Sequence, residues 1–209
     1  MRKRALSMML ITICFSGMIL FQGCSGNSAG SYSEDDMAYA DDNSEDAVNT
    51  LQVGSEYRIV TPMMELKEAV VNTLGDNYWP DALLTDEELA ERTGISASMY
   101  DNFMAEYQHS EAGIDMMILI EAKEESIVNV ENYLNDYREL LLKIYEKQPQ
   151  NRAKVFASRI ETIQNYVCYV QLGADIAPLE SQGEDEMVAY CQQENERALD
   201  IIEKRIVSR

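Results

Sequence analysis

The side chains most able to do chemistry in this chain of 209 residues are its four cysteines and its single histidine. His109 is followed by Ser110 and Glu111, and an imidazole beside a hydroxyl and a carboxylate has the groups of a general base. One histidine excludes metal sites that are built from several imidazoles. The sequence contains no Gly-rich phosphate loop, no S-x-x-K and no C-x-x-C. We therefore expect no catalytic residue, no metal ion and no cofactor, and we expect the chain not to be an enzyme.

Cys24 follows a sharp change of composition near the N-terminus. Residues 1–4 carry three basic side chains, and residues 5–21 carry no charge and are mostly apolar. A cationic start, an apolar core and a small residue before the cut form the layout of a secretory signal peptide. Gly23 supplies the small residue. The pattern predicts a signal peptide over residues 1–23.

The cysteine directly after Gly23 resembles the lipobox of bacterial lipoproteins, although Phe21 stands where leucine is commoner. The resemblance implies cleavage between Gly23 and Cys24 and a diacylglyceryl group on the Cys24 sulfur. Two fatty chains anchor a protein stably, so we expect a lipid-anchored protein on the outer face of the cell membrane. A secreted protein that is cut nearby and a protein with an uncleaved N-terminal membrane segment are the alternatives.

Acidic residues outnumber basic residues by 37 to 17, which gives a net charge of -20. Nucleic-acid binding needs clustered Lys and Arg, so nucleic acid is excluded as a partner. Residues 25–53 contain no Lys or Arg and are rich in Asp, Glu, Ser, Gly and Ala. Such a composition cannot bury enough apolar surface to fold. We expect residues 24–54 to be a disordered acidic linker, followed by a single domain over residues 55–209.

Four helices are predicted in that domain. The first begins at Thr61-Pro62 and ends at Gly75, and the second begins with the capping box of Thr85 and Glu88 and ends at Gly94. Apolar residues at helical spacing predict a long helix over residues 124–147, ended by Pro149, and a final amphipathic helix over residues 185–206.

Two hairpins are predicted between these helices. Residues 103–108 and 114–120 alternate with the period of strands, and both faces of the second segment are largely apolar. Residues 160–163 and 166–172 flank Gln164-Asn165, where Asn can adopt the positive φ of a tight turn. The order helix-helix, hairpin, helix, hairpin, helix predicts an α+β fold with an antiparallel sheet of two β-hairpins packed with helices.

Four features of this region occur together in a known family. They are the helix end at Gly94-Ile95, the apolar strand 114–120 with the residues 121–123 after it, the long helix ending near Tyr145, and the closing strand 166–170. In these features residues 64–172 resemble a family of uncharacterised bacterial lipoproteins, domain of unknown function 4358. The resemblance implies a surface lipoprotein and this fold, and it brings no catalytic residue.

Two further groups of residues have alternative interpretations. Cys168 and Cys191 fall on apolar faces and are expected as unpaired core thiols, with a disulfide between them as the alternative outside the cell. The aromatic pair in residues 78–80 is expected to pack against the core, with a sugar or peptide site as the alternative.

We therefore expect a membrane-anchored extracytoplasmic lipoprotein with a non-enzymatic domain that binds a protein partner in the cell envelope. The alternative is a small ligand-binding lipoprotein that serves a transporter. We rank it lower because such receptors usually have two lobes and therefore need a longer chain. A hydrolase is the third candidate.

Overall fold

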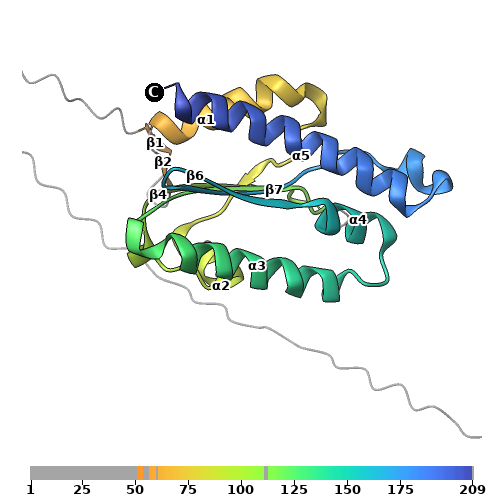
Figure 1. Ribbon diagram of the computed structural model, residues 1–209, viewed down its shortest axis with the longest axis horizontal. Coiled ribbons are helices and arrows are strands. Elements are labelled where there is room, and N and C mark those ends of the chain that lie inside the picture. Colours follow the sequence, from red (N-terminus) through yellow and green to blue (C-terminus); the bar gives the residue numbers. More distant parts are fainter. Residues whose placement is uncertain (1–50, 54–56, 60, 111–112, 209) are drawn as a thin grey trace, which may run out of the picture. The chain divides into compact units, whose positions relative to one another are not determined.

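The computed structural model describes residues 51–53, 57–59, 61–110 and 113–208 (Figure 1). The predicted signal peptide, the cleavage site at Gly23 and Cys24, and residues 24–50 of the predicted linker lie outside these described residues. Strand β1 (Leu51–Val53) pairs antiparallel with β2 (Tyr57–Ile59), so β1 falls within the last residues of the segment expected to be a linker.

The centre of the domain is an antiparallel sheet of five strands in the order β3-β4-β5-β7-β6. Its strands are β3 (Ala82–Leu83), β4 (Tyr100–Tyr107), β5 (Met116–Ala122), β6 (Arg159–Ile163) and β7 (Tyr166–Gln171). The two predicted hairpins are β4–β5 and β6–β7, and they join through the pairing of β5 with β7. The predicted α+β class with an antiparallel sheet is confirmed.

Helices cover both faces of this sheet (Figure 1). The helices α1 (Thr61–Leu74) and α5 (Glu184–Val207) lie on one face, and α2 (Asp86–Thr93) and α3 (Ile127–Ile144) lie on the other. Helix α4 (Pro149–Ala157) lies at one end of the sheet. The described residues also include four short 3₁₀ turns: η1 (Gly75–Asn77), η2 (Ala97–Met99), η3 (Glu124–Ser126) and η4 (Ala177–Gln182).

The side chains of β5 alternate between two hydrophobic cores. Met117 and Leu119 pack with residues of α1 and α5, whereas Ile118 and Ile120 pack with residues of α3. These four side chains are fully buried. A strand that is apolar on both faces needs a covering layer on each side, because each exposed side chain would cost about 1.5–3 kcal/mol.

The predicted helix ends of α1 and α2 are confirmed. The Thr85 hydroxyl accepts a hydrogen bond from the Glu88 N–H, and the Thr85 N–H donates to the Glu88 carboxylate, which together form the capping box. Gly94 ends α2 with φ of 83°, and Gly75 follows α1 with φ of 57°. Glycine adopts such left-handed angles without steric cost, so each helix ends where its glycine stands.

Two local predictions were wrong. Pro149 was expected to mark the end of the long helix, but it is the first residue of α4. Proline is tolerated at this position because the first N–H groups of a helix have no partner within the helix, so the N–H that proline lacks is not missed. In the β6–β7 turn the positive φ, 57°, belongs to Gln164 and not to Asn165. The first of two turn residues is where a type II′ turn places its positive φ.

A buried ion pair fixes α4 at the end of the sheet. Lys154 of α4 is 4% exposed and donates to Asp115, which is 0% exposed and directly precedes β5. The other Asp115 oxygen accepts from the backbone N–H groups of Gly173 and Ala174, at 3.1 and 2.9 Å. The Lys154 ammonium also lies 5.3 Å from the centre of the Trp79 ring. One carboxylate thus joins α4, the start of β5 and the segment after β7.

The substitution Lys154→Met tests this pair, because it leaves the Asp115 carboxylate buried without its cation. We expect the free energy of unfolding, measured by urea denaturation, to fall by about 3–5 kcal/mol. The matched control is Lys204→Met at an exposed position of α5, where we expect a change within about 0.5 kcal/mol. Equal losses in the two variants would show that the pair does not hold α4 in place.

Candidate functional site

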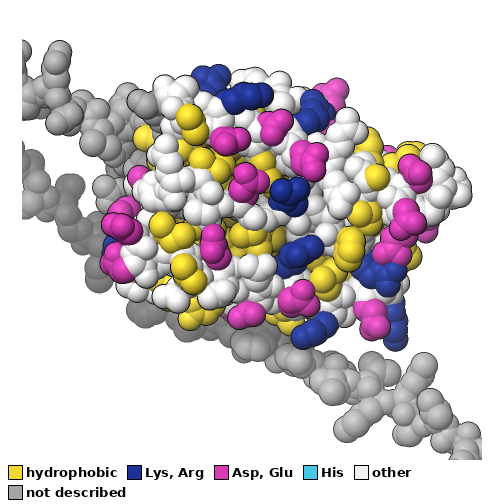
Figure 2. Space-filling view, in the orientation of Figure 1, with side chains coloured by type: hydrophobic (Ala, Val, Ile, Leu, Met, Phe, Trp, Pro, Cys, Tyr) yellow, Lys and Arg dark blue, Asp and Glu magenta, His cyan; other side chains and the backbone are white. Residues whose placement is uncertain are grey.

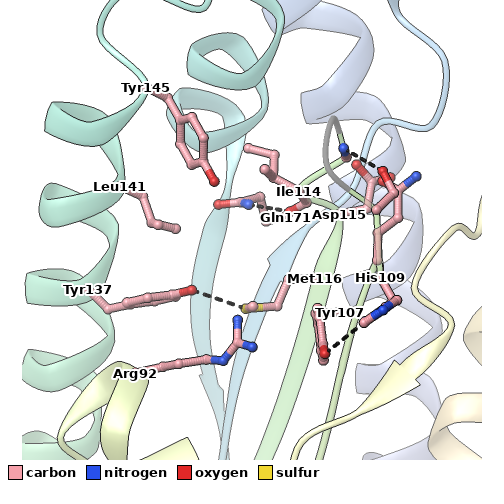
Figure 3. A pocket seen from close by; sticks show the side chains of 13 residues that line it. Arg92, Tyr107, His109, Ile114, Asp115, Met116, Tyr137, Leu141, Tyr145 and Gln171 are labelled. Atoms are coloured by element: carbon pink, nitrogen blue, oxygen red, sulfur yellow. Dashed lines mark hydrogen bonds between the residues drawn. The ribbon is translucent and has the colours of Figure 1, made fainter. Parts of the chain in front are cut away.

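A pocket of about 610 Å³ opens beside the C-terminal half of α3 (Figure 3). Met116 and Gln171 form its floor on the sheet, α3 forms one wall, and the end of the β4–β5 hairpin forms the opposite wall. The pocket is lined by Arg92, Tyr107, Gln108, His109, Ser110, Gly113, Ile114, Asp115, Met116, Tyr137, Leu141, Tyr145 and Gln171. Its volume lies within the range of about 300–1,000 Å³ that is usual for small-ligand sites.

The pocket exists because α2 is much shorter than α3. At 1.5 Å per residue, the eight residues of α2 span about 12 Å, whereas the eighteen of α3 span about 27 Å. The end of α2 sits close against α3, since a Cβ atom at Gly94 would lie 3.0 Å from the Tyr133 ring. The later turns of α3 extend past this contact, and Tyr137 and Leu141 from these turns line the pocket with Tyr145, which directly follows α3.

Aromatic rings and one arginine dominate the inside of the pocket. The Arg92 guanidinium carbon lies 4.5 Å from the centre of the Tyr107 ring, which is a cation–π distance. The Tyr137 hydroxyl donates to the Met116 sulfur at 3.8 Å, and a thioether is only a weak acceptor. Burial raises the pKa of Tyr137, and the charge of Arg92 acts in the opposite direction. Arg92 and Tyr137 therefore both offer hydrogen-bond donors to the pocket.

The polar groups of the floor are already paired. The Gln171 side chain accepts from the Tyr169 hydroxyl at 2.5 Å and donates to the Ile114 carbonyl at 2.6 Å. Asp115 is neutralised by Lys154. Among the described residues no ion pair includes Arg92. The pocket therefore presents positive charge and donors rather than negative charge.

His109, the one candidate general base, lies at the edge of this pocket. It is exposed, its Nδ1 atom lies 3.2 Å from the Tyr107 hydroxyl, and its backbone N–H donates to Asp81 at 2.6 Å. In the described part of the chain, His, Cys, Asp and Glu form no cluster that could hold a metal ion. Residues 26–30 read G-x-S-x-G, a serine hydrolase motif, but they lie outside the described residues.

A second hollow, of about 530 Å³, is more polar than the pocket beside α3, and its charged side chains already have hydrogen-bond or ion-pair partners. Arg138 donates to the Phe156 carbonyl at 2.8 Å, Glu131 accepts from the Thr162 hydroxyl, and Arg159 pairs with Glu161 and Glu196. Figure 2 shows acidic and basic side chains interspersed over one face of the domain rather than gathered into a patch. The pocket beside α3 is therefore the better candidate site.

The two core thiols and the aromatic pair Tyr78-Trp79, also singled out from the sequence, lie away from this pocket. Cys168 and Cys191 are both free and buried, in different hydrophobic clusters, so the structure holds the unpaired thiols and not the alternative disulfide. The Tyr78 hydroxyl donates to Glu106 at 2.7 Å, the Trp79 indole donates to the Asp76 carbonyl, and Tyr78 packs against the core. Tyr78 thus has the packing role that was expected for the pair, whereas Trp79 is half-buried and lies against the Lys154 ammonium.

Sequence reasoning did not find the pocket. Tyr137 was part of the apolar stripe of the long helix, and Arg92 lay in the last turn of a predicted helix. Both assignments are right, but nothing in the spacing indicates that α2 stops partway along α3. The abundance of tyrosine, twelve in all, was the only available signal.

The fold and the pocket define an α+β domain in which two helical layers enclose an antiparallel sheet. Residues 73–172 match the model of a family described as Domain of unknown function (DUF4358). The match runs from the end of α1 to the end of β7 and contains every residue that lines the pocket, whereas α5 lies beyond it. It supports the family resemblance seen in the sequence. No curated protein and no solved structure matches the chain.

None of the helices in the described ranges is both long enough and apolar enough to cross a membrane.

The two core thiols allow a chemical test of their environment. Burial raises the pKa of Cys168 and of Cys191 to about 12. Because the thiolate is the reacting form, only about one thiol in ten thousand is reactive at pH 8. We expect iodoacetamide to leave both unmodified in the folded chain and to alkylate both after unfolding in urea without a reductant, as read by peptide mass spectrometry. Alkylation that requires prior reduction would reveal a disulfide instead.

Proposed function

We propose that this chain is a lipid-anchored extracytoplasmic protein whose α+β domain binds a protein partner at the pocket beside α3, without catalysing a reaction. The observation that carries the proposal is the group of tyrosines around an open pocket, together with one arginine that has no carboxylate partner among the described residues. Tyrosine and arginine are enriched among the residues that dominate the energy of protein–protein interfaces.

Exposed apolar residues beside the pocket favour a protein over a small solute. Leu140 and Ile144 lie one turn apart on α3 and are 50% and 55% exposed. Each follows a pocket residue of α3 by three positions, Leu140 after Tyr137 and Ile144 after Leu141, which is the spacing of neighbours on a helix surface, so the apolar surface continues beyond the pocket mouth. Contiguous exposed apolar surface of this kind is typical of interaction sites. The pocket volume by itself also suits the alternative, a small ligand that is passed to a transporter.

The anchor in this proposal rests on the sequence around Gly23 and Cys24. Each buried methylene of a fatty chain contributes about 0.8 kcal/mol, so two chains on the Cys24 sulfur would hold the protein at the membrane. The acidic residues that follow would then act as a spacer. If residues 25–50 form a coil of about 26 residues, its average reach is roughly 30 Å, which would keep the domain clear of the lipid headgroups.

The substitution Cys24→Ala tests the anchor. Cells fed radiolabelled palmitate should label the unaltered chain and should fail to label the Cys24→Ala variant, because the acylated sulfur is gone. The matched control is Cys14→Ala, within the apolar segment of the predicted signal peptide, which should still be labelled. Labelling of the Cys24→Ala variant, or recovery of the unaltered chain from the cytosol, would contradict the anchor.

Site-specific photocrosslinking tests the partner. A benzophenone amino acid at Leu140, beside the pocket, should give one discrete covalent adduct in intact cells. The control position is Glu203, exposed on α5 in the other helical layer, which should not give that adduct. Tyr145→Ala, introduced together with the Leu140 crosslinker, should weaken the adduct because Tyr145 lines the pocket. The same faint adducts from both positions would argue against a partner at this site.

A further inference from the structure

We infer that the pocket beside α3 recognises the C-terminal carboxylate of a peptide with an apolar last residue, and that Arg92 and Tyr137 bind the carboxylate oxygens. This inference rests on the proposed function, because it names the chemistry of the partner segment that enters the same pocket.

Arg92 has the charge and the free donors for this role. Its guanidinium lies against the face of the Tyr107 ring and is hydrogen-bonded to Tyr137, and no carboxylate of the described residues pairs with it, so most of its five N–H donors have no anionic partner. In contrast, the pocket-facing Asp115 has its own cation in Lys154. A guanidinium that rests on an aromatic face keeps its N–H edge available, and its planar fork matches the two oxygens of a carboxylate.

Tyr137 of α3 supplies a second donor beside the Arg92 guanidinium (Figure 3). Its hydroxyl belongs to a buried side chain and has the Met116 sulfur, at 3.8 Å, as its hydrogen-bond partner. Exchanging this weak acceptor for a carboxylate oxygen would strengthen the hydrogen bond. A buried donor with a poor partner therefore faces the same space as an unpaired guanidinium.

The one carboxylate among the described residues of the pocket lining has its charge compensated. Asp115 receives hydrogen bonds from Lys154 and from the backbone of Gly173 and Ala174, so both of its oxygens are engaged. An anion that enters the pocket thus meets a neutralised carboxylate. Charge complementarity favours an anionic group here, although the chain as a whole carries a net charge of -20.

The apolar lining indicates which carboxylate fits. Ile114, Met116 and Leu141 offer apolar surface within the same pocket. The last residue of a peptide carries its side chain and its free carboxylate on one carbon atom, so both would enter a single pocket. The preceding residues would then leave across Leu140 and Ile144, the exposed apolar row on α3. A free fatty acid has the same carboxylate but only one apolar chain beside it, which cannot both fill the pocket and cover that row.

The test compares two peptides that end in leucine, one with a free carboxylate and one with a C-terminal amide. Binding to the full chain in nanodiscs is measured by fluorescence anisotropy. We expect the free acid to bind at least about ten-fold more tightly than the amide, because hydrogen bonds to charged groups are the stronger ones. Dodecanoate serves as the fatty-acid probe, and we expect it not to displace the peptide.

Two pairs of variants locate the effect. Arg92→Gln should abolish the preference for the acid, whereas Arg159→Gln, the same change at an exposed arginine of β6, should keep it. Tyr137→Phe should weaken binding of the acid by about three- to ten-fold. Tyr190→Phe, which removes a hydroxyl from α5, should not. Thermal melts of the four variants verify that each is folded.

Several outcomes would overturn the inference. They are equal binding of acid and amide, no binding of either peptide, a preference that survives Arg92→Gln, and displacement of the peptide by dodecanoate. If the Leu140 crosslinker captures a partner but the peptides show no preference, the carboxylate inference fails and the proposed function stands. If there is neither a crosslink nor peptide binding, both fail.

Discussion

The rest of the structure depends on one strand, β5, which is buried on both of its faces. Ile118, Leu119 and Ile120 are fully excluded from solvent, with neighbouring side chains pointing to opposite sides of the sheet. Exposing either face to solvent would lower the free energy of unfolding by several kcal/mol, so helices must cover both faces. The layer of α1 and α5 and the layer of α2 and α3 follow from this requirement.

The pocket arises because the layer of α2 and α3 covers its face of the sheet only in part. Helix α2 is eight residues long and seals only part of the surface next to α3. A longer α2 would have buried side chains such as Tyr137 and Tyr145 in the core. Because α2 is short, these side chains line the pocket instead. The end of α2 also carries Arg92, which places a positive charge at that opening. One short helix thus gives the site both its space and its charge.

Local patterns predicted much of the fold, and contacts distant in the sequence account for what they missed. The capping box at Thr85 and the two-residue period of β5 could be predicted because each depends only on residues that are close together in the sequence. The pairing of β5 with β7 and the ion pair of Asp115 with Lys154 join residues about forty or more positions apart, and no local pattern specifies them. The same holds for the site, where Arg92, Tyr107 and Tyr137 meet from three elements. The predicted lipid anchor at Cys24 lies outside the described residues and stays a prediction.

NMR of the full chain with labelled methionine methyl groups most directly tests whether this pocket is a binding site. Met116 lies on the pocket floor, whereas Met63 is a buried residue of α1, on the other face of the sheet. On titration with the leucine-terminated peptide acid, we expect the Met116 signal, assigned through Met116→Leu, to shift and saturate while the Met63 signal stays in place. A Met116 signal that does not move while the peptide binds would contradict the assignment of the binding site to this pocket.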